Sequence, residues 1–176
     1  KCSHSLCLTF SGTVKSYVKG VKNLSDSVYS KEEDNGTVGV SSKIKKTPKK
    51  MRLRDFIYKH AKKQKKAVLN WVKQYSPDVI LLQLSDSALL IDLALYISDK
   101  LGIKIATYNT EDYYFKNYDY IRQKFRQGLS YKKFHKNFKK TFNQLMLKKP
   151  LCIYNCDGLK ELYEKKFSLD GKVIYV

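Results

Sequence analysis

Residues 79–108, "VILLQLSDSALLIDLALYISDKLGIKIATY", decide the fold. The first six are apolar apart from Gln83, which is typical of a strand that is covered on both faces. Ser85-Asp86-Ser87 then supplies turn and N-cap side chains, and residues 88–97 form a helix that is apolar over most of its surface. Gly102 stands where a helix end favours a left-handed residue, and a second strand follows to Tyr108. Strand, helix and strand within about thirty residues form a βαβ unit, so the two strands are parallel and their crossover is right-handed.

The flanking sequence repeats this alternation of strands and helices. Short apolar strands are predicted at residues 6–10 and 151–154, and an apolar run closes the chain at 173–176. We therefore predict an α/β fold: a Rossmann-like, open and mostly parallel sheet with helices on both faces. Residues 1–170 are expected to form a single Rossmann-like domain. Residues 171–176 are expected to begin the passage to a second domain that is absent from this sequence.

Helical spacing and capping residues predict four further helices. Thr47 followed by Pro48 starts a long amphipathic helix over residues 49–75, whose inward face includes Ile57 and Val72. Phe134, Phe138, Phe142 and Leu145 recur every three to four residues, which indicates a helix that buries aromatic rings. Asp157 is expected to cap the last helix, and the spacing from Val14 to Val21 predicts a helix after the first strand. His60 and His135 are expected at the surface of basic helices.

The formal net charge of +19 is the most unusual property of the composition. A surface this basic expects an anionic partner, although a solvated basic surface is the plain alternative. Twelve Lys or Arg lie between residues 43 and 66, and eleven lie between 116 and 149. We expect the two basic regions to form one contiguous surface facing an anionic membrane, with these residues in it: Lys62, Lys63, Lys65, Lys66, Lys132, Lys133, Lys139 and Lys140.

Two adjacent carboxylates and several tyrosines follow the second strand of the βαβ unit. Ligands of open parallel sheets bind beyond the carboxyl ends of the strands, where the loops meet. Glu111 and Asp112 are therefore candidates for a catalytic general base toward a hydroxyl. The alternative is structural: one acid caps the following helix and the other pairs with a lysine. The candidate substrate-binding residues are Gly12, Ser85, Asp86, Tyr113, Tyr114 and Asn155, whereas Phe115 is expected to pack the loop onto the sheet.

Several chemistries are absent from the sequence. It contains neither a glycine-rich dinucleotide fingerprint nor a Walker A loop, and no Gly-x-Ser-x-Gly elbow. Cys2, His4 and Cys7 lack the spacing of a zinc site, so we expect neither a metal nor a bound cofactor. The thiols are expected to be reduced, as in a cytoplasmic protein. No apolar run approaches about 20 residues, so no transmembrane helix is expected.

The order of these motifs resembles a known family. "YSPDVILLQLSDSALLIDLALYISDKLGIKIATYNTEDYYF", a basic helical span and then "LCIYNCDGLKELYEKKF" are similar to the N-terminal domain of GT-B glycosyltransferases of the family 4 type. The resemblance runs from Tyr75 to Phe167. It implies that this domain holds the acceptor, while the nucleotide-sugar donor binds mainly to a C-terminal domain.

The resemblance also assigns positions. Gly12 would lie in the glycine-containing loop after the first strand, and Glu111 would occupy the usual place of the His-Asp or Glu loop. The sequence departs from the family pattern at two positions: the first loop has one glycine where two are common, and Lys104 replaces the usual proline. Without the second domain, this chain is expected to be inactive on its own.

The leading hypothesis is an acceptor-binding domain of a nucleotide-sugar-dependent glycosyltransferase, in cell-envelope or capsular polysaccharide synthesis. Its partners would be a sugar or lipid-linked acceptor, its own C-terminal domain and the inner face of an anionic membrane. The alternative is a basic nucleic-acid-binding α/β domain, in which lysines contact phosphates and aromatics stack on bases. A scaffold domain without activity is a third possibility.

Overall fold

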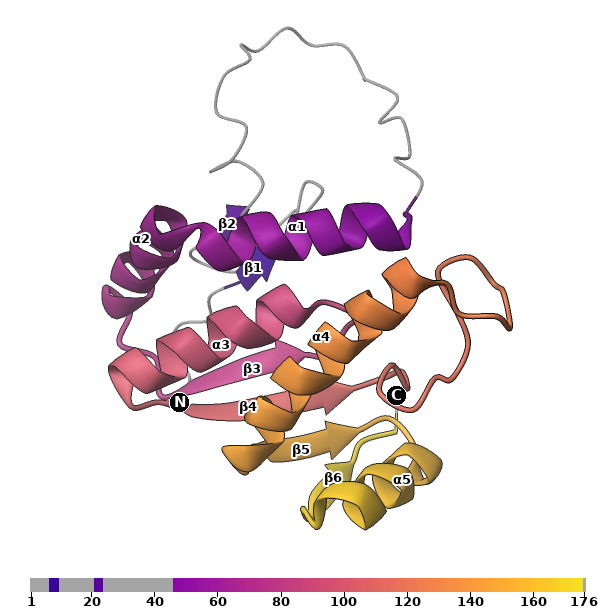
Figure 1. The fold of residues 1–176 in the computed structure, drawn as a ribbon. Helices are drawn as coiled ribbons and strands as arrows, with labels where there is room; N and C mark the ends of the chain where they lie inside the picture. The colour runs from indigo at the N-terminus through magenta and orange to yellow at the C-terminus, as the bar shows by residue number, and fades with distance from the viewer. Residues whose placement is uncertain (1–6, 10–20, 24–45, 176) are drawn as a thin grey trace, which may run out of the picture.

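The computed structural model describes residues 7–9, 21–23 and 46–175, and its centre is a four-stranded parallel sheet (Figure 1). The strand order follows the chain, and a helix connects each strand to the next. The α/β class and the open parallel sheet are therefore confirmed. The strands are β3 (Val79–Gln83), β4 (Lys104–Asn109), β5 (Leu151–Tyr154) and β6 (Gly171–Val173), and the connecting helices are α3 (Ala88–Leu101), α4 (Leu129–Leu147) and α5 (Asp157–Phe167).

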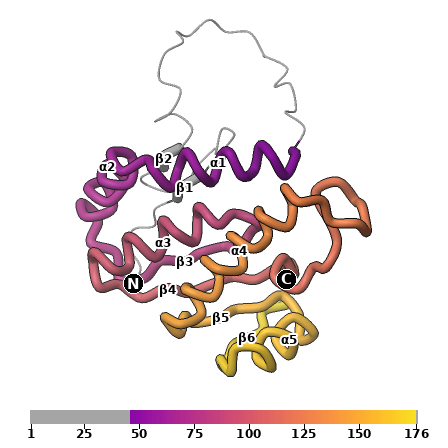
Figure 2. The backbone as a smooth tube through the Cα atoms, viewed as in Figure 1, coloured from indigo at the N-terminus to yellow at the C-terminus, as the bar shows by residue number. Residues whose placement is uncertain are grey.

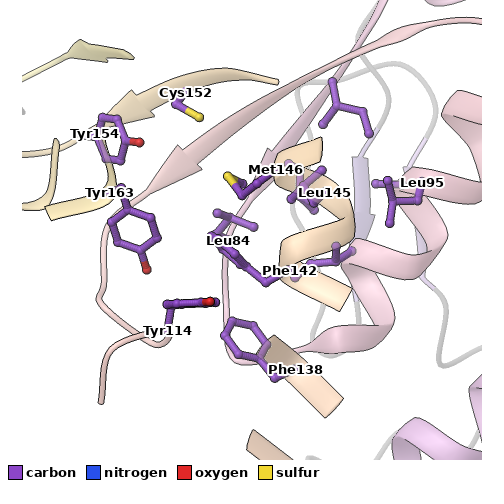
Figure 3. Close-up of a cluster of buried hydrophobic side chains, with 14 residues drawn as sticks. Leu84, Leu95, Tyr114, Phe138, Phe142, Leu145, Met146, Cys152, Tyr154 and Tyr163 are labelled. Carbon is purple, nitrogen blue, oxygen red and sulfur yellow. The ribbon is translucent and has the colours of Figure 1, made fainter. Parts of the chain in front are cut away.

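The three connecting helices cover the same face of the sheet. Right-handed crossovers that all step in one direction leave their helices on one side. Side chains from that face of β3, β4 and β5 share one core cluster with α3, α4 and α5, in which the rings of Phe142 and Tyr163 are central (Figure 3). On the opposite face Val79, Leu81 and Leu151 are at least half exposed. Helices on both faces, as expected, are thus not found in the described part of the chain, and the apolar run of β3 is covered on one side only.

The predicted long helix over residues 49–75 is divided in two. Thr47 caps α1 (Pro48–His60) as expected, because its hydroxyl accepts from the Lys50 N–H at 3.3 Å and Pro48 opens the helix. The helix ends at Ala61, whose ψ of 59° leaves the helical region, and α2 (Lys62–Lys73) begins immediately after it.

The break lets the two halves pack into different clusters. Met51 of α1 lies with Tyr131 and Phe134 of α4, whereas Val68 and Val72 of α2 pack against α3. One straight helix would keep a single continuous apolar face, and Ile57, which was expected on that face, is 51% exposed.

The predicted aromatic helix is confirmed as α4, in which Phe134, Phe138, Phe142 and Leu145 are all buried. The expectation for His135 is wrong, because its side chain lies inside the same aromatic row. Asp157 is the first residue of α5, and Cys156 holds the cap position. Residues 171–173 form β6, which pairs with β5 in the sheet (Figure 2). The first three residues of the expected passage to a second domain are therefore part of this domain's sheet.

The first predicted strand is found as β1 (Cys7–Thr9), but it lies outside the main sheet. It pairs in parallel with β2 (Val21–Asn23), so Val21 belongs to a strand and not to the helix predicted for it. Gly12, Cys2 and His4 fall outside the residues that the structure describes.

Candidate functional site

A pocket of about 300 Å³ opens at the carboxyl ends of β3 and β4. The two strands are paired from Val79–Lys104 to Gln83–Tyr108, and the Leu84 N–H donates to the Tyr108 carbonyl at 2.9 Å. Because the strands end level with each other, the loops that follow them share one rim. The pocket is lined by Lys46, Asp86, Glu111, Tyr113, Lys116, Tyr118, Tyr120, Ile121 and Gln123.

Lys116 lies between the acid and the tyrosines of this pocket. Its Nζ is 3.3 Å from Glu111 Oε2, 4.7 Å from the ring centroid of Tyr113 and 5.1 Å from that of Tyr120. The two ring centroids are 5.5 Å apart. A cation over aromatic faces gains from their negative π-surfaces, and the neighbouring carboxylate adds to that gain. The pocket therefore already presents a carboxylate, an ammonium group and flat aromatic faces within reach of one small ligand.

Asp86 gives the pocket a second carboxylate, beside Glu111 and the two lysines Lys46 and Lys116. Its carboxylate forms no hydrogen bond and no ion pair with the residues that the structure describes. Burial, and after it the charge of Asp86, raises the pKa of the Tyr113 and Tyr120 phenols. Both phenols thus remain protonated at neutral pH and can donate hydrogen bonds to a ligand oxygen.

Asp112 points away from the pocket that its neighbour lines. Its Oδ1 accepts from the Phe115 N–H at 2.9 Å and from the Tyr163 hydroxyl at 3.4 Å. It thereby closes the turn after β4 and ties that turn to α5. The split was predicted, since adjacent residues leaving a strand face opposite sides. The arrangement also fits the structural alternative, because Asp112 caps a turn and Glu111 pairs with a lysine.

Tyr114 was expected to wall the pocket, and the structure places it in the core. Figure 3 shows its ring among the other side chains of the core cluster. Only 7% of it is exposed, and its hydroxyl donates to Asn143 Oδ1 at 2.9 Å. Lys139 Nζ lies 5.0 Å from the centre of its ring. Phe115 packs edge-on against Tyr163 at 5.2 Å, which confirms its predicted packing role.

Ser85 and Asn155 stand near the rim without lining the pocket. The Ser85 hydroxyl accepts from the Ser87 N–H at 3.3 Å and so shapes the turn before α3. The Asn155 side chain donates to the Thr110 carbonyl at 3.3 Å and holds the loops after β4 and β5 together. Its Oδ1 is buried without a hydrogen-bond partner in the described chain.

Lys116, Tyr118, Tyr120 and His135 were not among the site residues predicted from the sequence. The first three come from the segment between β4 and α4, where no periodicity marks a face. His135 supports the pocket from behind: its Nε2 donates to the Tyr113 carbonyl at 2.9 Å. Burial lowers the pKa of His135, so the ring is neutral at pH 7. Its place four residues after Tyr131 and three before Phe138, which puts all three rings on one side of α4, was the available signal.

The lysines expected at a membrane surface lie on α2 and α4, two helices that both contact α3 (Figure 1). Lys65 pairs with Asp92 and Lys139 covers Tyr114. The other six, Lys62, Lys63, Lys66, Lys132, Lys133 and Lys140, are exposed. A contiguous basic surface across both helices stays a prediction.

Among the described side chains, no group of three or more His, Cys, Asp or Glu could hold a metal ion. The pocket instead offers hydrogen-bonding and stacking groups for an organic ligand. Protein-family models, curated proteins and solved structures all yield no match to this chain. The resemblance to glycosyltransferases therefore rests on the sequence pattern alone.

Proposed function

We propose that this chain is the acceptor-binding domain of a nucleotide-sugar-dependent glycosyltransferase of the GT-B type. The observation that carries the proposal is the pocket at the β3–β4 rim, in which Glu111 and Asp86 accompany three tyrosines. Carboxylates accept hydrogen bonds from sugar hydroxyls, and tyrosine rings offer flat faces to a pyranose together with a polar tip. A volume of about 300 Å³ is at the lower end of the usual range for small-molecule sites.

Glu111 is the better candidate for a base in such a reaction. It lines the pocket and 55% of its side chain is exposed, so an acceptor hydroxyl could reach the carboxylate beside Lys116, whose Nζ lies 3.3 Å from Oε2. Asp112 is engaged with Phe115 and Tyr163, and we assign it a structural role in the loop. The donor nucleotide sugar would be held mainly by a further domain.

The setting that we propose is the cytoplasmic face of a membrane, in synthesis of an envelope or capsular polysaccharide. No helix of the described chain has the length and apolarity needed to cross a bilayer. The exposed lysines of α2 and α4 would attract anionic lipid, at about 1 kcal/mol for each well-placed cation.

Saturation-transfer difference NMR with a panel of free monosaccharides, amino sugars and sugar phosphates tests the pocket. We expect saturation of sugar ring protons, and a loss of affinity of about ten-fold in Tyr113→Ala and Tyr120→Ala, since stacking is worth about 1 kcal/mol or more. Tyr175→Ala is the matched control, because Tyr175 is 72% exposed and does not line the pocket.

Circular dichroism would first establish that each variant is folded. Binding of no sugar in the panel would remove the basis of the proposal. Tight binding of single-stranded oligonucleotides that the tyrosine variants abolish would favour the nucleic-acid alternative instead.

A further inference from the structure

The outward face of α1 carries a ridge of exposed apolar side chains. Leu53, Phe56 and Ile57 are 59%, 63% and 51% exposed. Residues three and four apart lie on the same side of a helix, so these three form one continuous strip. We call it the α1 ridge. A single exposed leucine is ordinary on a protein surface, whereas an aligned Leu, Phe and Ile on one helix is an apolar patch that needs a reason.

The side chains of the α1 ridge do not take part in packing α1 against α4. The opposite side of α1 already buries Met51 against Tyr131 and Phe134 of α4. In Figure 2 the helix lies at the outer edge of the helical layer, beyond α3 and α4. Within the described part of the chain, α1 therefore packs through one face, and its second apolar face is exposed.

The charges of α1 are arranged around that ridge. Its one acid, Asp55, is withdrawn: its side chain is 8% exposed and lies 3.1 Å from Arg54. Every other exposed position of the helix holds a basic side chain: Lys49, Lys50, Arg52, Lys59 and His60. The outward surface of α1 thus combines apolar groups with cations and contains no exposed carboxylate.

We infer that α1 is a membrane-docking helix that lies in the plane of an anionic bilayer and inserts the α1 ridge among the lipid headgroups. Apolar residues flanked by Lys and Arg are the composition of helices that bind in the interface, about 5–10 Å deep. A second copy of the chain fits poorly, because docking ridge on ridge would bring two basic rims together. The inference goes beyond the proposed attraction of surface lysines, and it does not depend on sugar binding.

Vesicle flotation compares phosphatidylglycerol with pure phosphatidylcholine. We expect binding to the anionic vesicles only, and a loss of about ten-fold in affinity for Phe56→Ser, because a partly inserted ring forfeits about 1.5 kcal/mol or more. The control is Phe125→Ser, which removes a phenylalanine that is 97% exposed but lies outside α1. Its affinity should equal that of the wild type.

A fluorescence measurement separates insertion from charge attraction. The Trp71→Phe substitution first removes the one native tryptophan, and Phe56→Trp then places a single fluorophore on the α1 ridge. On binding to anionic vesicles, its emission maximum should shift to shorter wavelength. Lipids that carry a bromine or nitroxide on the acyl chain should quench this emission. Part of that signal should persist at about 1 M salt, where the Debye length is only about 3 Å.

Equal binding of the Phe56→Ser and Phe125→Ser variants would overturn the inference, and so would the absence of acyl-chain quenching. Self-association that Phe56→Ser abolishes, without any vesicle binding, would also overturn it and assign the ridge to a contact between copies. Because the sugar panel is measured without lipid, failure of one proposal leaves the other intact.

Discussion

At the scale of single residues, the two adjacent acids after β4 make different contacts. Glu111 has 55% of its side chain exposed and faces Lys116 in the pocket. Asp112 instead receives a backbone N–H and a tyrosine hydroxyl. The strand's alternation makes such a split predictable, but which acid turns inward depends on the tertiary position of Tyr163, fifty-one residues later.

Truncating each acid should separate stability from ligand binding. Asp112→Ala leaves the Phe115 N–H and the Tyr163 hydroxyl without their acceptor, so we expect a loss of about 1–3 kcal/mol in the free energy of unfolding. Glu111→Ala removes one exposed pair, so its free energy of unfolding should stay within about 1 kcal/mol of the wild type. Urea unfolding of both variants measures the contrast, and equal losses would show that the two acids have the same role.

His135 should make stability fall as the pH drops below neutral. Burial lowers its pKa in the folded protein below the ordinary value of about 6.5. Below pH 6.5 the His135 ring therefore binds a proton in the unfolded chain but not yet in the folded chain. The free energy of unfolding decreases with falling pH until the lower pKa of the folded state is reached. Above pH 6.5 the residue contributes no pH dependence.

His135→Gln removes the titrating ring while it retains a side-chain donor for the Tyr113 carbonyl. Urea unfolding between pH 7.5 and pH 5.5 should show a shallower decline in this variant than in the wild type. Parallel declines would mean that His135 takes up its proton as readily in the folded as in the unfolded chain.

At the scale of elements, the sequence predicted the features that depend only on neighbouring residues. The strand–helix–strand unit, the Thr47 cap and the buried row of α4 follow from periodicity and capping chemistry, and all three are present. The break at Ala61, the exposure of Leu81 and the burial of Tyr114 depend on which surfaces meet in three dimensions. Of the predicted site residues, Asp86, Glu111 and Tyr113 line the pocket, while most of its other lining residues come from the segment between β4 and α4, which has no regular pattern.

Two glycines of the last βαβ unit should respond oppositely to alanine. A Cβ on Gly171 of β6 would lie 2.4 Å from Tyr154 Cε2 and 3.0 Å from the Cys152 carbonyl oxygen. Because Tyr154 is buried in the core, it cannot move freely, and we expect Gly171→Ala to cost about 1–3 kcal/mol.

Gly158 in the first turn of α5 is the matched control, since nothing lies within 4 Å of a Cβ built there. Gly158→Ala should stabilise the protein by about 0.4–1 kcal/mol, because alanine restricts the unfolded chain and favours the helix. Urea unfolding compares the two variants. A neutral Gly171→Ala would indicate that β6 can shift away from β5 without loss.

At the scale of the whole molecule, the chain carries far more positive charge than its fold neutralises. Its 35 Lys and Arg face 16 Asp and Glu, and the described residues form only five ion pairs. Even if every acid were paired, the formal net charge of +19 at pH 7 would leave more than half of the cations without a carboxylate partner. The exposed apolar side chains of the sheet and of the α1 ridge would favour association between copies, whereas repulsion between the positive charges opposes it.

This excess charge should make the folded chain more stable when salt is added. Folding concentrates like charges, and their mutual repulsion lowers the free energy of unfolding. At about 0.1 M salt the Debye length is about 10 Å, so repulsion between exposed lysines is largely screened. The exposed ion pairs are weakened too, but each contributes only about 0–1 kcal/mol, and they are few beside the unpaired cations.

We therefore expect Tm to rise with NaCl at pH 7 and then to level off once screening is complete. A continued linear rise would point to exclusion of salt from the surface, and a fall in Tm would show that the ion pairs outweigh the repulsion. Calorimetry at low protein concentration, from about 0.01 M to about 1 M NaCl, distinguishes these three curves.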